Sequence, residues 1–282
     1  MIRRWGIISG IAITAIVGSF VVFIAFHAVP GMSVALFFSD TSPFDAVFKG
    51  APVWNGLWTP LLGTLRLLFL TMVFAVPMGL SIGIYASEYA GEKMEQRFVI
   101  LFESLAGLPS IIVGLFGFVL ILFLRRHFFP ANTCLLLASF CLSILVLPVL
   151  SLNTYTALKG IPQSVRIAAA STGLSREIAV FRLLVPAAAE GIFSGLLLAA
   201  GRCAEDTAVI LITGAVANAG NMTGILGKFE ALPFFIYYTS ANYRNETQLA
   251  QVFTAAFLLL VVTMALLLTG TALKNRSRLW TR

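Results

Sequence analysis

The chain has 282 residues, of which 59% are hydrophobic and only 11% are charged, and its formal net charge is +7. A soluble domain carries about 25% charged residues, so this composition excludes most soluble and disordered proteins. The excess of Lys and Arg does not indicate a nucleic-acid-binding protein, because these residues flank apolar segments and form no basic stripe with interleaved aromatic residues. The composition therefore predicts a membrane protein.

Six apolar segments are long enough to cross the hydrocarbon core of a bilayer, which takes about 20 residues of helix. They cover residues 6–29, 61–86, 98–124, 133–152, 191–216 and 250–272. No A-x-A site closes the first segment, which favours an uncleaved span over a signal peptide. We therefore predict an all-α polytopic protein. Its expected parts are an N-terminal transmembrane helix (1–29), an outer loop (30–60), a core of five spans (61–272) and a basic tail (273–282).

The distribution of Lys and Arg predicts the orientation of these spans. With both termini in the cytoplasm, twelve basic residues face inward and five face outward. The inner set is Arg3, Arg4, Lys93, Arg97, Lys159, Arg166, Arg176, Arg182, Lys274, Arg276, Arg278 and Arg282, and the outer set is Lys49, Arg125, Arg126, Lys228 and Arg244. We expect Arg125 and Arg126 to snorkel to the outer interface or to meet an anionic solute.

The inner loop over residues 153–190 is long, Ala-rich and amphipathic. Pro162 can begin a short helix over 163–172, and Gly173 can end it. Ser175 is a plausible N-cap of a second helix, which Pro186 would kink or end just before the fifth span. Such a helix–Gly–helix element suits docking on a cytoplasmic partner. The alternative is an ordinary interfacial linker.

The fifth segment contains charged residues within an apolar stretch. An arginine near the middle of a bilayer costs about 2.5–3.5 kcal/mol, so a retained one usually faces a pathway or a partner. Arg202 and Asp206 are four residues apart and are expected on one helix face. The guanidinium group suits a phosphate-like anion, and Asp206 could hold Arg202 when no anion is present. The alternatives are a permanent ion pair that locks the helix, or pairing of either group with a partner subunit.

Other features predict packing and exclude some chemistry. The pairs Gly79/Gly83 and Gly191/Gly195 favour close helix packing. The three cysteines lie in apolar stretches without a CxxC pair, so neither a disulfide framework nor a metal site is predicted. No G-x-x-x-x-G-K-[ST] motif is present, so we expect no ATP binding by a P-loop.

The inner loop resembles the signature loop of ABC importer permeases, which reads Glu-Ala-Ala, then Gly, then an aliphatic-x-Leu-Pro ending. The matching residues are Ile167-Ala168-Ala169, Gly173, Leu183 and Val185-Pro186. Ile167 stands where this family usually has Glu. The resemblance implies a type I importer fold with a cytoplasmic coupling helix. It also implies an ATPase-coupling loop that includes Pro162, Ile167, Ala168, Ala169, Gly173 and Pro186, with Ala168, Ala169 and Gly173 as docking residues.

Further stretches are similar to one branch of these permeases, the phosphate-uptake (PstA-like) subunits. They are residues 84–90 (IYASEYA), 105–117 (LAGLPSIIVGLFG) and 202–208 (RCAEDTA). The family reads Gly-Glu where this chain has Glu205-Asp206. The resemblance implies a substrate pathway that includes Arg202, Glu205, Asp206 and Thr207.

The resemblance implies a phosphate permease subunit in the cell inner membrane that is not itself an enzyme and needs no cofactor. Its implied partners are two ATP-binding subunits, a second permease in a heterodimer, an extracytoplasmic phosphate-binding protein and membrane lipid, with no nucleic acid. A permease for sulfate or molybdate remains an alternative. An ion-coupled secondary transporter is a more distant one, because no duplicated halves are visible. A membrane-embedded enzyme would need clustered His, Asp or Glu on facing spans, which the sequence does not indicate.

Overall fold

A computed structural model of the chain describes residues 2–29, 32–127, 132–220 and 224–277. The end of the predicted basic tail, residues 278–282, lies outside the described residues. Over the described ranges the regular elements are helices, without a β-strand. The chain divides into two compact units. Unit 1 comprises residues 1–63, 216–222 and 229–261, and unit 2 comprises residues 64–215, 223–228 and 262–282.

Six helices in the described part of the chain are long and apolar enough to cross a membrane. They run over Arg4–Ala28, Trp58–Tyr89, Ser110–His127, Leu135–Lys159, Arg176–Glu205 and Glu246–Thr269. The predicted number of spans and the predicted all-α fold are therefore confirmed. The bounds of the third and fifth spans differ from the prediction, and both differences have a local cause in the backbone.

The third predicted span, 98–124, is divided between two helices. Helix α5 (Glu92–Ala106) begins with acidic residues in its first turn, and only α6 (Ser110–His127) meets the length and hydropathy of a span. The two helices are separated at Gly107–Pro109. Pro109 has no backbone N–H and disfavours a helical conformation at the residue before it, which accounts for the break.

The fifth predicted span, 191–216, is wrong at both ends. The apolar helix begins at Arg176, in α9 (Arg176–Ala179), and continues through a π-helical turn, η3 (Val180–Leu184), into α10 (Val185–Glu205). Pro186 therefore does not end a helix, because the wider turn before it relieves the clash of the proline ring with the preceding turn. The break comes later, at Asp206 and Thr207, and α11 (Ala208–Thr213) follows as a separate short helix.

Unit 1 contains α1 (Ile2–Ala28), α2 (Val34–Phe38), α3 (Pro43–Phe48), α12 (Leu232–Asn242) and the first part of α13 (Glu246–Ser277). The predicted outer loop 30–60 thus contains two short helices, which Ser33 and Ser42 cap at their N-termini through their hydroxyl groups. The core of this unit gathers apolar side chains from α2, the segment before α4, α12 and α13: Leu36, Leu57, Leu232, Phe235 and Ala255.

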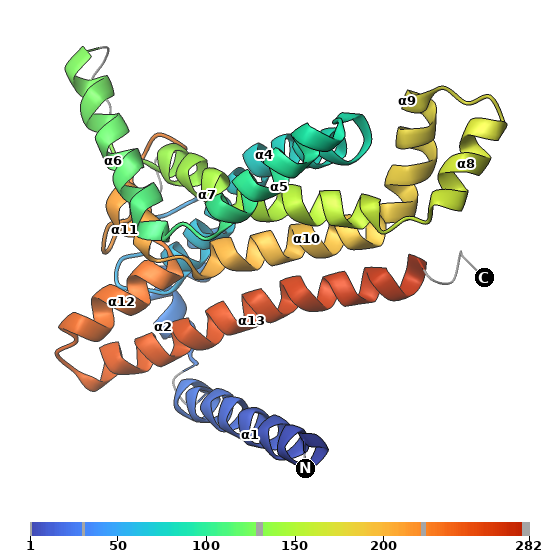
Figure 1. Cartoon of the computed structure of the whole chain (residues 1–282). Coiled ribbons are helices and arrows are strands. Elements are labelled where there is room, and N and C mark those ends of the chain that lie inside the picture. The colour runs from blue at the N-terminus through green and yellow to red at the C-terminus, as the bar shows by residue number, and fades with distance from the viewer. Residues whose placement is uncertain (1, 30–31, 128–131, 221–223, 278–282) are drawn as a thin grey trace. The chain divides into compact units, whose positions relative to one another are not determined.

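In unit 2, α7 (Leu135–Lys159) is the central helix and packs along α10 (Figure 1). Glycines permit the close approach of its neighbours. A Cβ atom at Gly83 of α4 (Trp58–Ile84) would lie 2.6 Å from Thr154, and one at Gly195 of α10 would lie 2.6 Å from Asn153. Gly79 and Gly191 approach α7 in the same way. The predicted close packing of both glycine pairs is confirmed.

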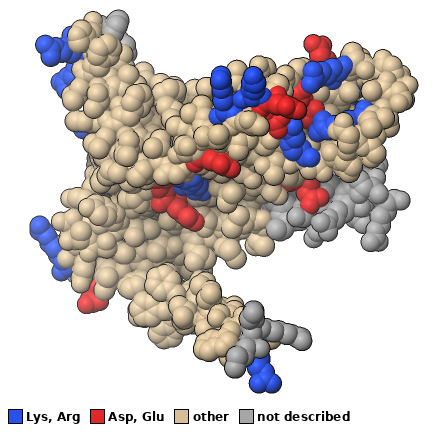
Figure 2. Space-filling view, viewed as in Figure 1, with Lys and Arg blue, Asp and Glu red and all other residues tan. Residues whose placement is uncertain are grey.

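The far end of unit 2 carries a helical hairpin of α8 (Gln163–Ser171) and α9, here called the α8–α9 hairpin, residues 163–179. It lies at the ends of α7 and α10 that are opposite α6 and α11 (Figure 1). Apolar side chains join it to the spans, among them Leu158, Val180 and Leu184. Figure 2 shows charged side chains gathered over this end of the unit, whereas most of the visible surface carries no charge.

Candidate functional site

The end of α10 contains an open recess of about 480 Å³. Its walls come from α10, from the residue that follows α10, and from α13, and they comprise Leu197, Leu198, Gly201, Arg202, Glu205, Asp206 and Leu267. Three of the four predicted pathway residues, Arg202, Glu205 and Asp206, therefore lie together. Thr207 is not among the residues that line this recess.

Arg202 lies in the last turn of α10 and does not pair with Asp206. Its guanidinium nitrogens lie 3.4 and 3.5 Å from the backbone carbonyl of Ala106, the last residue of α5. No ion pair joins Arg202 to Asp206 in the described ranges. The predicted common helix face is wrong, because α10 ends at Glu205 and Asp206 has an extended backbone.

Asp206 is engaged with the helix that follows it. Its Oδ1 accepts a hydrogen bond from the backbone N–H of Val209 at 2.9 Å, within the first turn of α11. A carboxylate at a helix N-terminus satisfies a free N–H group and opposes the helix dipole. Arg202 thus contacts a backbone carbonyl at the C-terminus of α5, and Asp206 accepts a hydrogen bond from a backbone N–H at the N-terminus of α11. Within the described residues, no carboxylate forms an ion pair with the guanidinium of Arg202.

The residues of the predicted coupling loop lie in or near the α8–α9 hairpin. Pro162 occupies the N-cap position of α8, and Gly173 has a φ of +72° between α8 and α9, a conformation that favours glycine. Ile167 is 60% exposed, and Ala168 and Gly173 are also exposed. Ala169 is buried within the chain, and its predicted docking role stays a prediction. It packs inside because it lies on the other side of this short amphipathic helix.

Four apolar side chains of this region are exposed: Ile167, Leu174, Ile178 and Phe181, here called the hairpin patch. Ile167 and Phe181 are both 60% exposed. Exposed large apolar side chains are typical of surfaces that contact another protein or a membrane when they gather in one patch. Pro186 does not belong to this surface, because it lies inside the helix of the fifth span.

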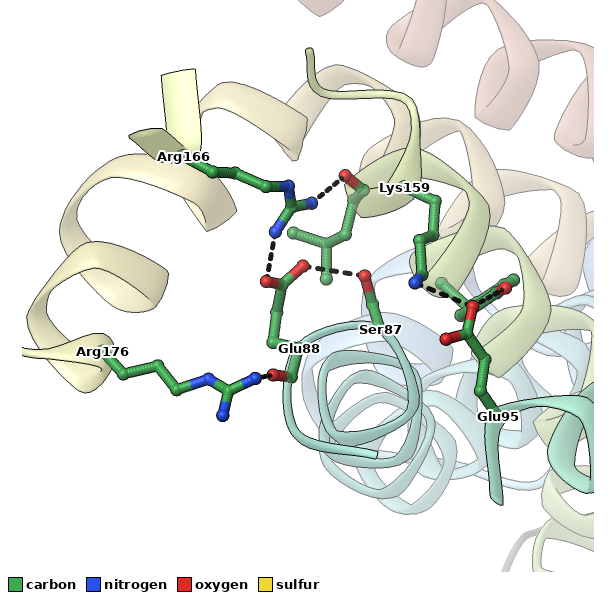
Figure 3. Close-up of polar contacts among 8 residues, drawn as sticks. Ser87, Glu88, Glu95, Lys159, Arg166 and Arg176 are labelled. Carbon is green, nitrogen blue, oxygen red and sulfur yellow. Dashed lines mark hydrogen bonds and ion pairs between the residues drawn. The ribbon is translucent and has the colours of Figure 1, made fainter. Parts of the chain in front are cut away.

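Sequence reasoning missed the central residue of the hairpin's attachment, Glu88. This residue lies at the end of the second span, in the π-helical turn η2 (Tyr85–Tyr89), and is buried. Its carboxylate pairs with Arg166 of α8, and its backbone carbonyl accepts a hydrogen bond from Arg176 of α9 (Figure 3). The sequence offered two signals, an acidic residue at the end of an apolar segment and its place within the PstA-like stretch 84–90, and neither indicated a contact with the hairpin. The two arginines had been interpreted only as markers of orientation.

A second ion pair lies nearby and does not involve the hairpin. Lys159 at the end of α7 lies 2.7 Å from Glu95 of α5, and the hydroxyl of Tyr155 donates to the same carboxylate at 2.5 Å (Figure 3). The hydrogen bond from Lys159, and then that from Tyr155, lower the pKa of Glu95 below its usual value. This pair joins α5 to α7.

These features define a multi-pass membrane protein with a charged recess at a helix break and an apolar hairpin at one end. Residues 75–278 match the family of binding-protein-dependent transport system inner membrane components. The chain belongs to this family and, within it, to the PstA-like branch of ABC importer permeases. The predicted resemblance is confirmed.

Two relatives are informative about this branch. The probable ABC transporter permease protein YqgI of Bacillus subtilis is 28% identical over 231 residues, which are 82% of this chain and 73% of the relative. The phosphate transport system permease protein PstA 1 of Mycobacterium tuberculosis is 30% identical over 208 residues, which are 74% of this chain and 67% of the relative.

The structure also resembles that of a permease chain from a bacterial alginate ABC transporter. The TM-score is 0.63 at 14% sequence identity, and the match covers 98% of this chain and 96% of the other. At this identity the likeness establishes the fold alone. It therefore confirms the predicted permease fold and does not identify the solute.

Proposed function

We propose that this chain is the permease subunit of an ATP-driven importer for inorganic phosphate and forms half of its translocation pore. The recess at the end of α10 carries the proposal, because it places a guanidinium group at a break in an apolar helix. Relatives in the same branch support phosphate as the solute, since one of them is named as a phosphate transport system permease.

Arg202 is suited to bind an oxyanion transiently. Its contacts with the Ala106 carbonyl, at 3.4 and 3.5 Å, lie beyond the usual range of N–H···O hydrogen bonds and are therefore weak. A phosphate oxygen offers the planar guanidinium shorter, charge-assisted hydrogen bonds. Glu205 and Asp206 in the same recess repel an anion and would limit how tightly it is held, and transport requires release.

The hairpin patch is the proposed docking surface for an ATP-binding subunit. In this assembly two such subunits hydrolyse ATP below the membrane, and this chain performs no hydrolysis itself. A second permease completes the pore, and an extracytoplasmic binding protein delivers phosphate. The proposed orientation in the cell inner membrane has both termini in the cytoplasm, which puts the α8–α9 hairpin on the same side.

One observation favours a second candidate, a permease for another oxyanion such as sulfate or molybdate. The recess contains Glu205 and Asp206 where the PstA-like branch has Gly and Glu, so it carries one carboxylate more than expected. This departure lies in the recess that carries the proposal, so the solute of this chain can differ from that of its phosphate-transporting relatives. The same coupling hairpin would serve either solute.

The decisive experiment uses the complete importer in vesicles, with its ATP-binding subunits and second permease. Purified binding proteins loaded with phosphate or with sulfate are added to the outer side, and both ATP hydrolysis and solute uptake are measured. We expect stimulation by the phosphate-loaded protein and none by the sulfate-loaded one. Stimulation by sulfate alone would establish the second candidate with sulfate as its solute, and no stimulation by either would contradict both a phosphate permease and a sulfate permease.

A further inference from the structure

Four elements of unit 2 meet at Glu88. The carboxylate of Glu88 pairs with Arg166 of α8, while the same arginine donates to the Leu158 carbonyl of α7 at 2.8 Å. Arg176, the first residue of α9, donates to the backbone carbonyl of Glu88. Both arms of the α8–α9 hairpin are therefore attached to one residue at the end of the second span (Figure 3).

This attachment is buried, which distinguishes it from an ordinary surface ion pair. The Glu88 side chain is 6% exposed and that of Arg166 is 20% exposed. The Ser87 hydroxyl donates to the second carboxylate oxygen of Glu88 at 2.8 Å. A buried pair with its remaining hydrogen bonds satisfied holds one geometry, whereas an exposed pair exchanges between several and contributes little.

The backbone around Glu88 also has an unusual form. The second span ends in η2, a π-helical turn closed by a hydrogen bond of 2.9 Å from the Ala90 N–H to the Tyr85 carbonyl. Such turns inside helices are rare and are frequent at functional sites. Arg176 lies over the ring of Tyr89, 5.1 Å from its centre, so a second residue of η2 also contacts the hairpin.

The hairpin is thus connected to the spans by two routes. One route is covalent, because the helix from α9 to α10 runs without interruption from Arg176 to Glu205, beside the charged recess. The other passes through Glu88 into α4. The chain also joins the hairpin to α7, which ends at Lys159, so the covalent connections alone would carry a load to the fourth and fifth spans and not to the second.

We infer that Glu88 is a positioning residue that fixes the α8–α9 hairpin to α4, so that the second and fifth spans move together when the ATP-binding subunits move the hairpin. This inference rests on the proposed function, in which the hairpin docks on those subunits. Glu88 touches no solute in this role. Its carboxylate acts through Arg166, and the loss of that pair separates ATP hydrolysis from transport.

The first test replaces the buried pair by uncharged groups of similar size, Glu88→Gln with Arg166→Met. Changing both partners avoids an unpaired buried charge, which would destabilise the chain. We expect the complex to assemble and its stimulated ATP hydrolysis to persist, while the solute transported per ATP falls about tenfold. A merely structural role would lower the amount of complex and leave this ratio unchanged.

Glu95→Gln is the matched control, because it breaks the neighbouring Lys159–Glu95 pair without touching the hairpin. The ratio of solute to ATP should stay at the wild-type value in this variant. An equal fall of the solute-to-ATP ratio in the control and in the Glu88 double variant would overturn the inference. Coupling would then depend on both ion pairs at this end of unit 2 and not on Glu88 in particular.

The second test restores the connection covalently. Glu88→Cys and Arg166→Cys are combined and joined by a short bifunctional thiol reagent, and the two single-cysteine variants serve as controls. The native cysteines Cys134, Cys141 and Cys203 are buried. We expect the unlinked double variant to be uncoupled and the linked one to recover most of the transport per ATP. A linked complex that cannot transport would overturn the inference, because the hairpin would then have to slide past α4.

These outcomes are separable from a failure of the proposed function. A wild-type complex without binding-protein-stimulated ATP hydrolysis would contradict the proposed function before Glu88 is considered. A fully coupled wild-type complex with equally coupled Glu88 variants would contradict only the positioning role.

Discussion

The guanidinium of Arg202 contacts the backbone carbonyl of Ala106, at 3.4 and 3.5 Å, although Asp206 lies in the same recess. Ala106 ends α5 at the Gly107–Pro109 break, and Arg202 lies just before the second break at Asp206. One side chain thus connects two interruptions of apolar helices. Backbone that leaves helical geometry in a membrane protein needs such partners, or a neighbouring cavity, to satisfy its polar groups.

The two roles of Arg202 can be separated with Arg202→Gln. The contacts with Ala106 are long and weak, so we expect their loss in the shorter glutamine to leave normal yields of assembled complex. Phosphate uptake should fall by about 10- to 100-fold, because charge-assisted hydrogen bonds worth about 1.5–3 kcal/mol are lost. Uptake in vesicles and the amount of purified complex are the measurements. Arg202→Lys, which keeps the charge without the planar fork, should retain part of the uptake, and undiminished uptake in the glutamine variant would contradict a pathway role.

Asp206 should contribute to stability through its cap of α11. Asp206→Ala leaves the Val209 N–H without its acceptor, and we expect a loss of about 1 kcal/mol of stability. Asp206→Asn keeps an acceptor oxygen and should lose much less. Thermal unfolding in mild detergent compares the two. Equal unfolding temperatures for the alanine and asparagine variants would mean that the capping bond is unimportant.

Glu230 lies between α11 and α12, outside the six candidate spans, and is buried. Burial raises the pKa of its carboxyl to about 7, although hydrogen bonds from the N–H groups of Asn218 and Ala219 act in the opposite direction. The ordinary value is 4.5. The folded state therefore binds a proton more tightly than the unfolded state does.

It follows that the contribution of Glu230 to stability is complete below pH 4.5 and is lost as the pH rises through about 7. The loss is on the order of 3 kcal/mol, at about 1.4 kcal/mol per unit of pKa. Glu230→Gln removes the titration, so its stability should fall less than that of the wild type between pH 5 and 8. Parallel unfolding temperatures of the two proteins over this range would contradict the prediction.

Gly83 should tolerate no side chain. A Cβ atom there would lie 2.6 Å from the Cβ of Thr154 and 2.7 Å from the backbone oxygen of Ser151. Because a backbone atom cannot rotate away, Gly83→Ala should separate α4 from α7 and cost about 1–3 kcal/mol. Gly91→Ala, where no atom lies within 4 Å, is the control. The yield of monodisperse protein and its unfolding temperature should fall only for the Gly83 variant.

Gly173 should determine the shape of the hairpin through its backbone alone. Its φ is +72°, and a Cβ atom would meet nothing within 4 Å, so the expected cost of Gly173→Ala comes from strain and not from a clash. A strain of about 1 kcal/mol would weaken association with the ATP-binding subunits about fivefold. Gly173→Asn should be milder, because asparagine adopts this conformation more readily. Pull-down of the ATP-binding subunits measures the association of both variants. Wild-type association of the alanine variant would contradict the prediction that this position requires glycine.

Much of the fold could be predicted from local patterns. The number of spans follows from the lengths of the apolar runs, and the two glycine pairs in α4 and α10 predicted the close packing on α7. The bounds of the fifth span could not be predicted in this way. Pro186 predicts a helix kink or end by itself, whereas in the structure a π-helical turn precedes it and the helix continues.

The candidate site, too, could be predicted in part from the sequence and in part only from the structure. The residue types at Arg202, Glu205 and Asp206 indicated a charged site, because charges within an apolar helix are expensive and are visible in the sequence. Their partners depended on where α10 ends and on how α5 and α11 approach it. The sequence by itself thus determined a six-span permease with an arginine in its fifth span. Only the tertiary structure decided that Arg202 contacts Ala106 and that Glu88 holds the hairpin, because contacts between residues 78 to 96 positions apart leave no periodic pattern in the chain.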